Sequence, residues 1–267
     1  MTTPHRARKR FGQNFLHDQG VIHRIVDAIH PRPGQHLVEI GPGQGAITES
    51  LLDSGCQLDV IELDRDLVPV LEEKFSDRDN FRIHQGDALQ FDFGQLVSGA
   101  GSGKMRLVGN LPYNISTPLI FHLLDYAGQI EDMHFMLQRE VVNRMAATPG
   151  GKAWGKLGVM AQFHSHIEAL FEVPASAFSP PPKVVSAIVR LQPHAAPVDR
   201  AAEKQLRRVV SAAFSQRRKT LRNTLRDLVD VQQLEELGIA PGARAETLTL
   251  EQFVAISKTI GQDETEE

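Results

Sequence analysis

The sequence predicts an α/β fold: a mainly parallel, doubly wound sheet followed by a small helical C-terminal domain. Its first half alternates short apolar strands with amphipathic helices, and polar motifs stand where successive strands should end. Strands and helices that alternate at this spacing form βαβ units, whose strands lie parallel. Because ligands of such sheets bind beyond the carboxyl ends of the strands, we expect these motifs to form one site.

Apolar residues recur on one helical face between residues 21 and 29, and Pro31 and Pro33 end this first helix. Strands are then expected at 36–40, 58–63, 81–85, 105–108 and 133–137. Helices are expected at 47–52, 66–75, 118–126 and 138–147. Pro69 falls in the first turn of its helix, where proline is tolerated.

The chain changes character near residue 193. Further strands are expected at 167–173 and 184–191, and helices at 203–214, 218–229 and 250–260. Residues 194–198 are expected to form a linker. We therefore predict a ligand-binding domain over 1–193 and a helical domain over 194–267.

Composition limits the class of protein. Hydrophobic residues make up 41% of the 267 residues and charged residues 23%, which is typical of a globular protein and not of a disordered or fibrous one. No apolar run approaches the ~18 residues that cross a bilayer. Polar residues follow the basic N-terminus, where a signal peptide needs an apolar stretch. A cytoplasmic protein without membrane contact is expected.

Cysteine and histidine usage bears on disulfides and metals. Cys56 is the single cysteine, which excludes an internal disulfide, and its apolar neighbours predict a small buried side chain. The eleven histidines are scattered and lack zinc-ligand spacing, so no metal is expected.

The distribution of charge differs from its total. The formal net charge of −4 argues against a nucleic-acid partner, yet residues 204–226 hold eight Lys or Arg and no Asp or Glu. Local fields decide where a polyanion binds. Arg218, Arg222 and Arg226 recur every four residues, so on a helix over 218–229 they would share one face. Taken alone, such a face is more often simply solvated. A second basic cluster contains Arg6, Arg8, Lys9 and Arg10.

Three motifs follow the first three strands. Glu39–Gly45 has glycines at alternate positions, which let a backbone turn sharply beside a ligand. Glu62 can accept hydrogen bonds from both hydroxyls of a ribose, and Asp87 can accept from an adenine amino group. Singly, the glycine run is compatible with a simple turn and Asp87 with a helix N-cap. Together they favour an adenosine-containing cofactor.

The fourth motif, Asn110-Leu111-Pro112-Tyr113, is typical of enzymes that methylate amino groups of bases or amides. An aromatic amine is a poor nucleophile because its lone pair is delocalised into the ring. The Asn110 oxygen and a backbone carbonyl at Leu111 or Pro112 can accept both N–H groups, which favours the developing tetrahedral nitrogen. Tyr113 offers a face for a splayed-out base. The alternative is an ordinary Asn-Pro loop with a core tyrosine.

These motifs, in this order, resemble those of the ribosomal RNA adenine dimethyltransferases. The segment Phe11–Leu16 is similar to that family's N-terminal cofactor segment, and 178–184 is similar to a later motif in which an aromatic, here Phe178, packs against the target adenine. The segment 215–223 resembles the branch that acts on small-subunit (16S) rRNA, the bacterial kasugamycin-sensitivity methyltransferases.

The resemblance implies a Rossmann-like class I sheet that uses S-adenosylmethionine, with residues 1–193 as the methyltransferase domain and 194–267 as an rRNA-binding domain. It implies dimethylation of N6 of two adjacent adenosines in the loop of the 3′-terminal hairpin, within an immature small subunit, by a monomer. The implied cofactor contacts are Asn14, Leu16, Gly41, Glu62, Asp87 and Asn110, with Gln13 beside them. The implied catalytic residues are Asn110, Leu111, Pro112, Tyr113 and Phe178, and the implied RNA contacts are Arg217, Arg218, Lys219, Arg222 and Arg226.

Four other readings stay open at this point. A nicotinamide dehydrogenase shares the sheet and Glu62 but leaves Asn110–Tyr113 unexplained. A large-subunit rRNA adenine methyltransferase shares most motifs and differs chiefly in the C-terminal domain. A non-catalytic ribosome-assembly checkpoint and a DNA adenine methyltransferase are the remaining two.

Lys152 and Lys156 offer a second RNA contact, while Trp154 between them is expected to pack internally.

Overall fold

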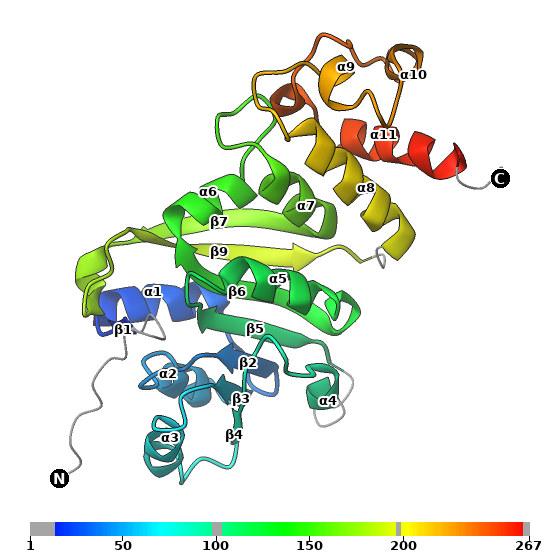
Figure 1. Ribbon diagram of the computed structural model, residues 1–267. Coiled ribbons are helices and arrows are strands. Elements are labelled where there is room, and N and C mark those ends of the chain that lie inside the picture. The colour runs from blue at the N-terminus through cyan, green and yellow to red at the C-terminus, as the bar shows by residue number, and fades with distance from the viewer. Residues whose placement is uncertain (1–13, 98–102, 196–198, 264–267) are drawn as a thin grey trace. The chain divides into compact units, whose positions relative to one another are not determined.

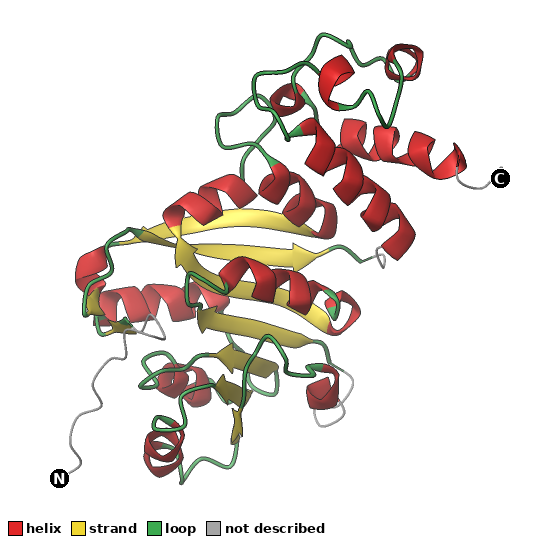
Figure 2. Ribbon diagram, viewed as in Figure 1, coloured by secondary structure: helices red, strands yellow, loops and turns green. Residues whose placement is uncertain are grey.

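The computed structural model describes residues 14–97, 103–195 and 199–263 (Figures 1 and 2). The basic cluster Arg6–Arg10 and residues 11–13 of the expected cofactor segment lie outside the described residues. Contacts divide the chain into two compact units, residues 1–142 with 168–195 and residues 143–167 with 196–267. The predicted boundary at 193/194 kept residues 143–167 in the first domain, whereas the structure groups them with the second unit. The chain passes from the first unit into the second and then returns, and a linear sequence does not show such a return.

A seven-stranded sheet forms the first unit, in the order β4-β3-β2-β5-β6-β9-β7. Its strands are β2 (His36–Ile40), β3 (Gln57–Glu62), β4 (Phe81–Gln85), β5 (Met105–Asn110), β6 (Ile130–Gln138), β7 (Ser165–Val173) and β9 (Ser186–Pro193). Strands β2 to β6 pair in parallel, while β9 pairs antiparallel with β6. The structure confirms the predicted α/β sheet. Because β2 to β6 all run in the same direction, their carboxyl ends lie at the same edge of the sheet.

Helices flank this sheet on both sides (Figure 2). They are α1 (Gln19–Ile29), α2 (Thr48–Asp53), α3 (Val68–Lys74), α4 (Gly94–Val97), α5 (Ser116–Leu124) and α6 (Arg139–Met145), which runs on into the second unit. Helix α1 begins where the Asp18 carboxylate accepts from the backbone N–H of Val21. Its buried residues include Ile22, Ile25 and Ile29, which confirms the apolar face predicted from their spacing.

A two-stranded sheet joins distant parts of the chain. Strand β1 (Phe15–Leu16) pairs antiparallel with β8 (Phe178–Ser179), and Leu16 lies opposite Phe178. The backbone N–H of His17 also donates to the carbonyl of Ala177, 3.0 Å away. This pairing was absent from the sequence-based expectation, because two residues are too few to show a strand period.

The second unit is helical. It contains α7 (Lys156–His164), α8 (Arg200–Ala213), α9 (Leu221–Thr224), α10 (Val231–Glu236) and α11 (Leu250–Asp263). Helices α8 and α11 pack together through apolar side chains, including fully buried Leu206, Val209, Phe253 and Ile256. Trp154 is buried here and its indole N–H donates to the carbonyl of Leu248, which confirms its expected packing role.

The expected helix over 218–229 is wrong in extent. Only Leu221–Thr224 are helical. The helix starts at Leu221 because Thr220 is extended, and the backbone N–H groups of Leu221 and Arg222 donate to the carbonyls of Ala243 and Pro241. Arg218 precedes the helix and Arg226 follows it in a turn, so they do not share a face with Arg222 as helical spacing predicted.

Candidate functional site

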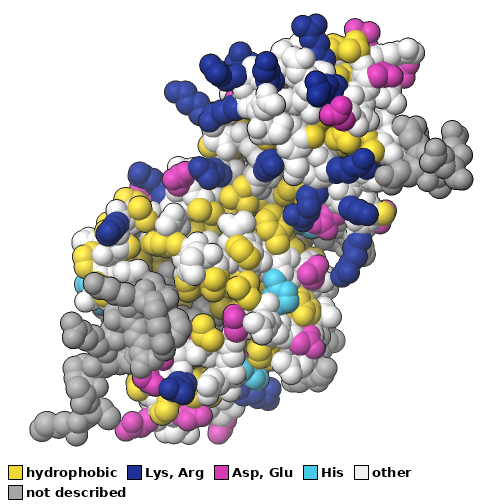
Figure 3. All heavy atoms as spheres, in the orientation of Figure 1, with side chains coloured by type: hydrophobic (Ala, Val, Ile, Leu, Met, Phe, Trp, Pro, Cys, Tyr) yellow, Lys and Arg dark blue, Asp and Glu magenta, His cyan; other side chains and the backbone are white. Residues whose placement is uncertain are grey.

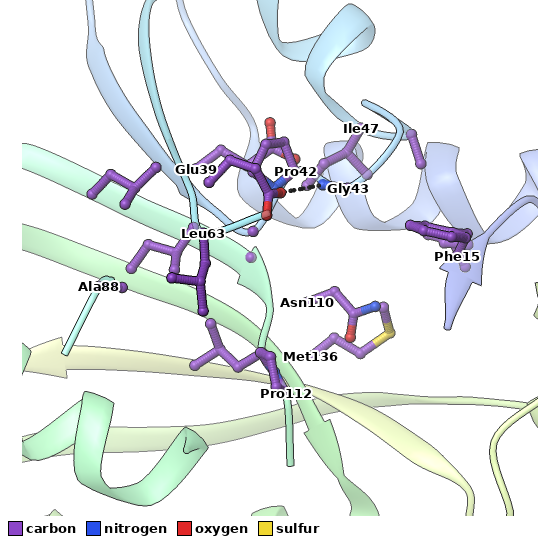
Figure 4. A pocket seen from close by; sticks show the side chains of 18 of the residues that line it. Phe15, Glu39, Pro42, Gly43, Ile47, Leu63, Ala88, Asn110, Pro112 and Met136 are labelled. Carbon is purple, nitrogen blue, oxygen red and sulfur yellow. Dashed lines mark hydrogen bonds between the residues drawn. The ribbon is translucent and has the colours of Figure 1, made fainter. Parts of the chain in front are cut away.

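One pocket in the first unit brings the predicted site residues together at the carboxyl ends of the parallel strands (Figure 4). Every expected cofactor and catalytic position lines it: Asn14, Leu16, Gly41, Glu62, Asp87, Asn110, Leu111, Pro112, Tyr113 and Phe178. These residues come from β1, the loops after β2 to β5, and β8. For the motifs after β2 to β5 the convergence follows from parallel topology, since each ends a strand of the same sheet. Asn14, Leu16 and Phe178 are brought in by the separate pairing of β1 with β8.

The loop after β2 has the backbone that its glycines predicted. Gly41, Gly43 and Gly45 all have positive φ, between 60° and 76°, a region that other residues rarely adopt. A Cβ on Gly43 would lie 3.2 Å from the ring of Phe15, so this glycine also lets β1 approach the loop. The positive φ angles therefore set the path of the loop, and the missing side chain at Gly43 leaves room for Phe15 to pack against it.

Glu62 is a buried carboxylate held by backbone donors. Its oxygens accept from the N–H of Asp64 at 2.8 Å and from the N–H of Gly43 at 3.3 Å, the bond drawn in Figure 4. Burial raises the pKa of Glu62 against the lowering effect of these bonds. A carboxylate has about four lone-pair directions. Two stay available for a diol, so Glu62 fits the ribose of the expected cofactor.

Asp87 serves the local turn and also lines the pocket. Its Oδ1 accepts from the backbone N–H of Leu89 at 3.0 Å, which closes a turn over residues 88–90. No helix begins here, so the helix N-cap weighed for this residue is not what the structure shows. The backbone N–H of Gly86 donates to the carbonyl of Glu62, which ties the end of β4 to the end of β3. Asp87 is thereby held beside Glu62 with carboxylate capacity for a further donor.

Asn110 ends β5 and lines the pocket (Figure 4). Its amide Nδ2 donates to the backbone carbonyl of Asn14, 3.3 Å away, which orients Oδ1 as the acceptor of the pair. Gly109 makes this position possible, because a Cβ there would lie 2.5 Å from the carbonyl oxygen of Ile40. Close approach of β5 to β2 therefore brings Asn110 near the glycine loop.

The loop 111–113 is fixed by backbone bonds. The N–H of Leu111 donates to the carbonyl of Met136, and the Pro112 carbonyl accepts from the N–H of Ile115 at 3.1 Å. Of the two carbonyls considered as a second amine acceptor, the one at Pro112 is already engaged. The geometry therefore favours the carbonyl of Leu111.

Two aromatic residues differ in accessibility. Phe178 lines the pocket but is only 3% exposed and packs within the hydrophobic core of the unit. Tyr113 is half-buried, and its hydroxyl lies 2.8 Å from the hydroxyl of Ser186. Tyr113 is therefore the more open of the two faces for a base.

The sequence reasoning missed several lining residues. Phe15, His134 and Met136 belong to the pocket wall, as does Glu39 at the end of β2. Apolar and histidine positions inside a strand have no local signature of a pocket. Glu39 did have such a signature, because it is a carboxylate within an otherwise apolar strand. Burial of a carboxylate is unfavourable without a partner, which points to a site at this position.

Glu39 is a titratable group at the base of this pocket. Burial, opposed by a 2.7 Å hydrogen bond from the Thr48 hydroxyl and reinforced by the charge of Glu62, raises its pKa from 4.5 to about 7. A raised folded-state pKa means that the folded protein holds this proton more tightly than the unfolded chain. Stability from this group is therefore full below pH 4.5 and is lost as the pH rises through 7.

We expect Glu39→Gln to remove that dependence. In the protein without cofactor, the free energy of unfolding of the wild type should fall by about 3 kcal/mol more than that of the variant between pH 4.5 and 8. Glutamine keeps the shape and can still accept from Thr48. Denaturant unfolding at a series of pH values measures the difference, and parallel curves for the two proteins would contradict it.

The candidate RNA contacts belong to the second unit. Arg217, Arg218, Lys219, Arg222 and Arg226 are all exposed, and Lys and Arg side chains gather over this part of the surface (Figure 3). Arg217 donates to the carbonyl of Lys152 at 3.0 Å and lies 3.6 Å from the Glu246 carboxylate. Residues 143–167 therefore add Lys152 to the same basic surface, which the linear sequence did not show.

The part of the chain that the structure describes also bears on metal ligands, apolar helices and Cys56. There, no group of three or more His, Cys, Asp or Glu side chains could hold a metal ion. Within the same ranges, no helix is both long and apolar enough to cross a bilayer. Cys56 is fully buried, which confirms its expected packing role, and burial raises the pKa of its thiol.

The arrangement suits binding of an adenosine-containing cofactor beside a target amine. Carboxylates stand at the ends of β3 and β4, a left-handed glycine loop follows β2, and an amide acceptor follows β5. A nicotinamide dinucleotide would share the ribose contact at Glu62 but would leave the acceptor at Asn110 without a role. The residues present therefore fit an uncharged diol and an aminated base.

Comparison with known proteins agrees with this geometry. The family model for ribosomal RNA adenine dimethylase matches residues 4–262. The ribosomal RNA small subunit methyltransferase A of Pseudomonas aeruginosa is 61% identical over 259 residues, which cover 97% of this chain and 96% of that one. The protein of the same name from Pseudomonas putida is 60% identical over 261 residues, which cover 97% of each chain.

Solved structures share the fold. A dimethyladenosine transferase from Plasmodium falciparum has a TM-score of 0.79 at 22% identity, over 94% of this chain and 98% of that one. The 23S rRNA methyltransferase ErmE has a TM-score of 0.72 at 28% identity, over 93% and 100%. Since the family model spans nearly the whole sequence and relatives near 60% identity cover it end to end, the chain belongs to the ribosomal RNA adenine dimethylase family.

Proposed function

We propose that this chain transfers methyl groups from S-adenosylmethionine to N6 of two adjacent adenosines in the loop of the 3′-terminal hairpin of 16S rRNA. The observation that carries the proposal is the convergence of Asn110, Glu62 and Asp87 in one pocket. Relatives named for the small subunit are about 60% identical to this chain, against 28% for the large-subunit enzyme ErmE, which favours the small-subunit substrate.

The cofactor is held by the residues at the strand ends. Asn14 and Leu16 contact the cofactor, and Gly41 approaches its amino-acid part. Glu62 accepts from the ribose hydroxyls, and Asp87 accepts from the adenine amino group. When bound, S-adenosylmethionine supplies an electrophilic methyl group on a positively charged sulfur. The apolar wall formed by Leu16 and its neighbours excludes water, which would otherwise compete as a nucleophile.

The target amine is positioned by acceptors. Asn110 Oδ1 and the Leu111 carbonyl accept its two N–H groups, which turns the nitrogen lone pair toward the methyl group. Both acceptors bind more strongly as the nitrogen becomes positive, so they stabilise the transition state more than the bound substrate. The hydrogen bond to the Asn14 carbonyl holds the Asn110 side chain in this orientation before the substrate binds.

No side chain needs to act as a general base in this scheme. The N-methyl arylammonium formed at N6 is a strong acid, because the neutral amine regains conjugation with the ring, so its proton leaves to water near Asn110. Each transfer would break one S–CH3 bond and leave a neutral thioether, so the second methylation needs a second cofactor molecule after the amine rotates. The enzyme is proposed to act as a cytoplasmic monomer on an immature small subunit, as a step in its biogenesis.

RNA is bound outside the pocket by the basic surface of the second unit. We assign phosphate contacts to Arg217, Arg218, Lys219, Arg222 and Arg226, all of which are exposed. Arginine suits this role because its fork donates two parallel hydrogen bonds to a phosphate. Tyr113 and Phe178 are the aromatic residues assigned to the flipped base.

Labelled-methyl transfer to under-methylated small subunits tests the proposal. With S-adenosylmethionine, the label should appear in 16S rRNA and elute as N6,N6-dimethyladenosine on nucleoside analysis. Large subunits and adenine-containing DNA serve as parallel substrates. Label in 23S rRNA or DNA alone would assign the site to a different substrate, and no transfer to any of the three would leave a non-catalytic role in ribosome assembly.

A further inference from the structure

We propose that Ser186 is a positioning residue, which fixes the phenol end of Tyr113 and thereby the place of the ring that the target adenine stacks against. The inference rests on the proposed function and goes beyond it, since Ser186 belongs to none of the motifs and does not line the pocket. Its hydroxyl lies 2.8 Å from the Tyr113 hydroxyl. Ser186 therefore acts on the target through another side chain.

Burial makes this hydrogen bond persistent. Ser186 is fully buried at the start of β9, where it pairs in register with Gln138 of β6. A buried hydroxyl without a partner is unfavourable, so the Ser186 hydroxyl and the phenol hold each other. Ile188, two residues further on the same face of β9, lines the pocket and places that face toward the site.

Tyr113 is anchored at both ends as a result. Its backbone carbonyl accepts from the hydroxyl of Ser116, which is also buried, at 3.2 Å. Its phenol end is held by Ser186, and the residue lines the pocket. A tyrosine held only by its backbone would rotate about two side-chain bonds. The second anchor fixes the place of the phenol oxygen and therefore the direction of the ring axis.

The same bond limits what Tyr113 does chemically. Its hydroxyl is engaged with Ser186 and so is assigned no proton transfer, which leaves the ring face as its contribution. Ser186 also begins the strand that follows the Phe178-bearing segment, so β9 links the two aromatic residues assigned to the target base. The position of Tyr113 is therefore set by β9 as well as by its own loop.

A double-mutant cycle tests the role. We expect Ser186→Ala, Tyr113→Phe and the double variant each to lower kcat by about five-fold, the size of one neutral hydrogen bond. Because both changes remove the same bond, their effects should not add. The KM for small subunits, set chiefly by phosphate contacts, and the affinity for S-adenosylmethionine should stay within about two-fold.

Ser165→Ala is the matched control. Ser165 is also a buried serine, and its hydroxyl has no hydrogen-bond partner among the described residues. The Ser165→Ala variant should leave kcat unchanged. Multiplicative losses in the cycle, or a loss for Tyr113→Phe far larger than for Ser186→Ala, would overturn the inference. A loss in thermal stability of Ser186→Ala with normal kcat would reduce Ser186 to a structural residue.

Nuclear magnetic resonance gives a readout that needs no activity. The chain has two tyrosines, Tyr113 and Tyr126, so ring-labelled tyrosine yields two sets of signals. Ser186→Ala should shift or broaden the Tyr113 signals and leave those of Tyr126 in place. Unchanged Tyr113 signals would overturn the inference even if methyl transfer were intact, whereas failure of wild-type transfer would count against the proposed function alone.

Discussion

Replacing Asn110 with alanine should lower methyl transfer by about a thousandfold while leaving the protein folded. Alanine removes the Oδ1 acceptor that we assign to the amine, and loss of one preorganised hydrogen-bonding group at a reacting centre costs about 10²–10³ in kcat. The bond from Asn110 to the Asn14 carbonyl is lost as well. Glu62, Asp87 and the glycine loop remain, so cofactor affinity should fall by less than ten-fold.

Asn110→Asp separates the two functions of this side chain. Aspartate keeps an acceptor for the amine but cannot donate to the Asn14 carbonyl, which its charge would instead repel. We expect transfer between that of the wild type and that of Asn110→Ala, with weaker cofactor binding than either. Asn143→Ala, an exposed asparagine on α6, is the control and should be unaffected.

The outcome is read from single-turnover transfer and from a separate cofactor titration. Near-normal transfer by Asn110→Ala would contradict the positioning role, because no other side-chain amide ends a strand at this pocket among its lining residues. A variant that neither folds nor binds cofactor would be recognised by circular dichroism. In that case Asn110→Asp carries the test.

Reversing Arg218, Arg222 and Arg226 to glutamate should weaken binding to small subunits by about a hundredfold at ~0.1 M salt. These side chains are exposed, so the change replaces attraction to phosphates with repulsion and leaves the apolar core intact. The dependence of log K on log salt should become shallower by roughly two to three, since three phosphate contacts release fewer counterions. Cofactor affinity should not change.

A charge-matched control distinguishes local from global electrostatics. Arg32, Arg82 and Lys104 are exposed cations of the first unit, outside the pocket lining. Their reversal to glutamate changes the net charge equally and should weaken RNA binding much less. Equal losses in the two triple variants would show that net charge, and not the surface that holds Arg218, governs binding.

The geometry of that basic surface differs from the sequence-based prediction. Helical spacing placed Arg218, Arg222 and Arg226 on one face, but α9 covers Leu221–Thr224 only. Backbone bonds from Leu221 and Arg222 to the 241–243 loop replace the helical bonds that periodicity assumes. The charged residue types predicted that these side chains are exposed. Their arrangement depends on the 241–243 loop, about twenty residues further along the chain.

The sequence by itself determined which strand ends form the site and which motif residues stand there. Apolar periodicity located β2, β3, β4 and β5, and a parallel sheet must bring the carboxyl ends of its strands to one edge. The positions of Gly41, Glu62, Asp87 and Asn110 in the pocket follow from these local signals alone.

Only the tertiary structure decided the contacts between segments far apart in the chain. The pairing of Leu16 with Phe178, the bond from Asn110 to Asn14 and the contact of Tyr113 with Ser186 each join residues with no shared local pattern. The grouping of 143–167 with the second unit has the same origin. Such contacts depend on chain packing and loop closure, which residue spacing does not encode.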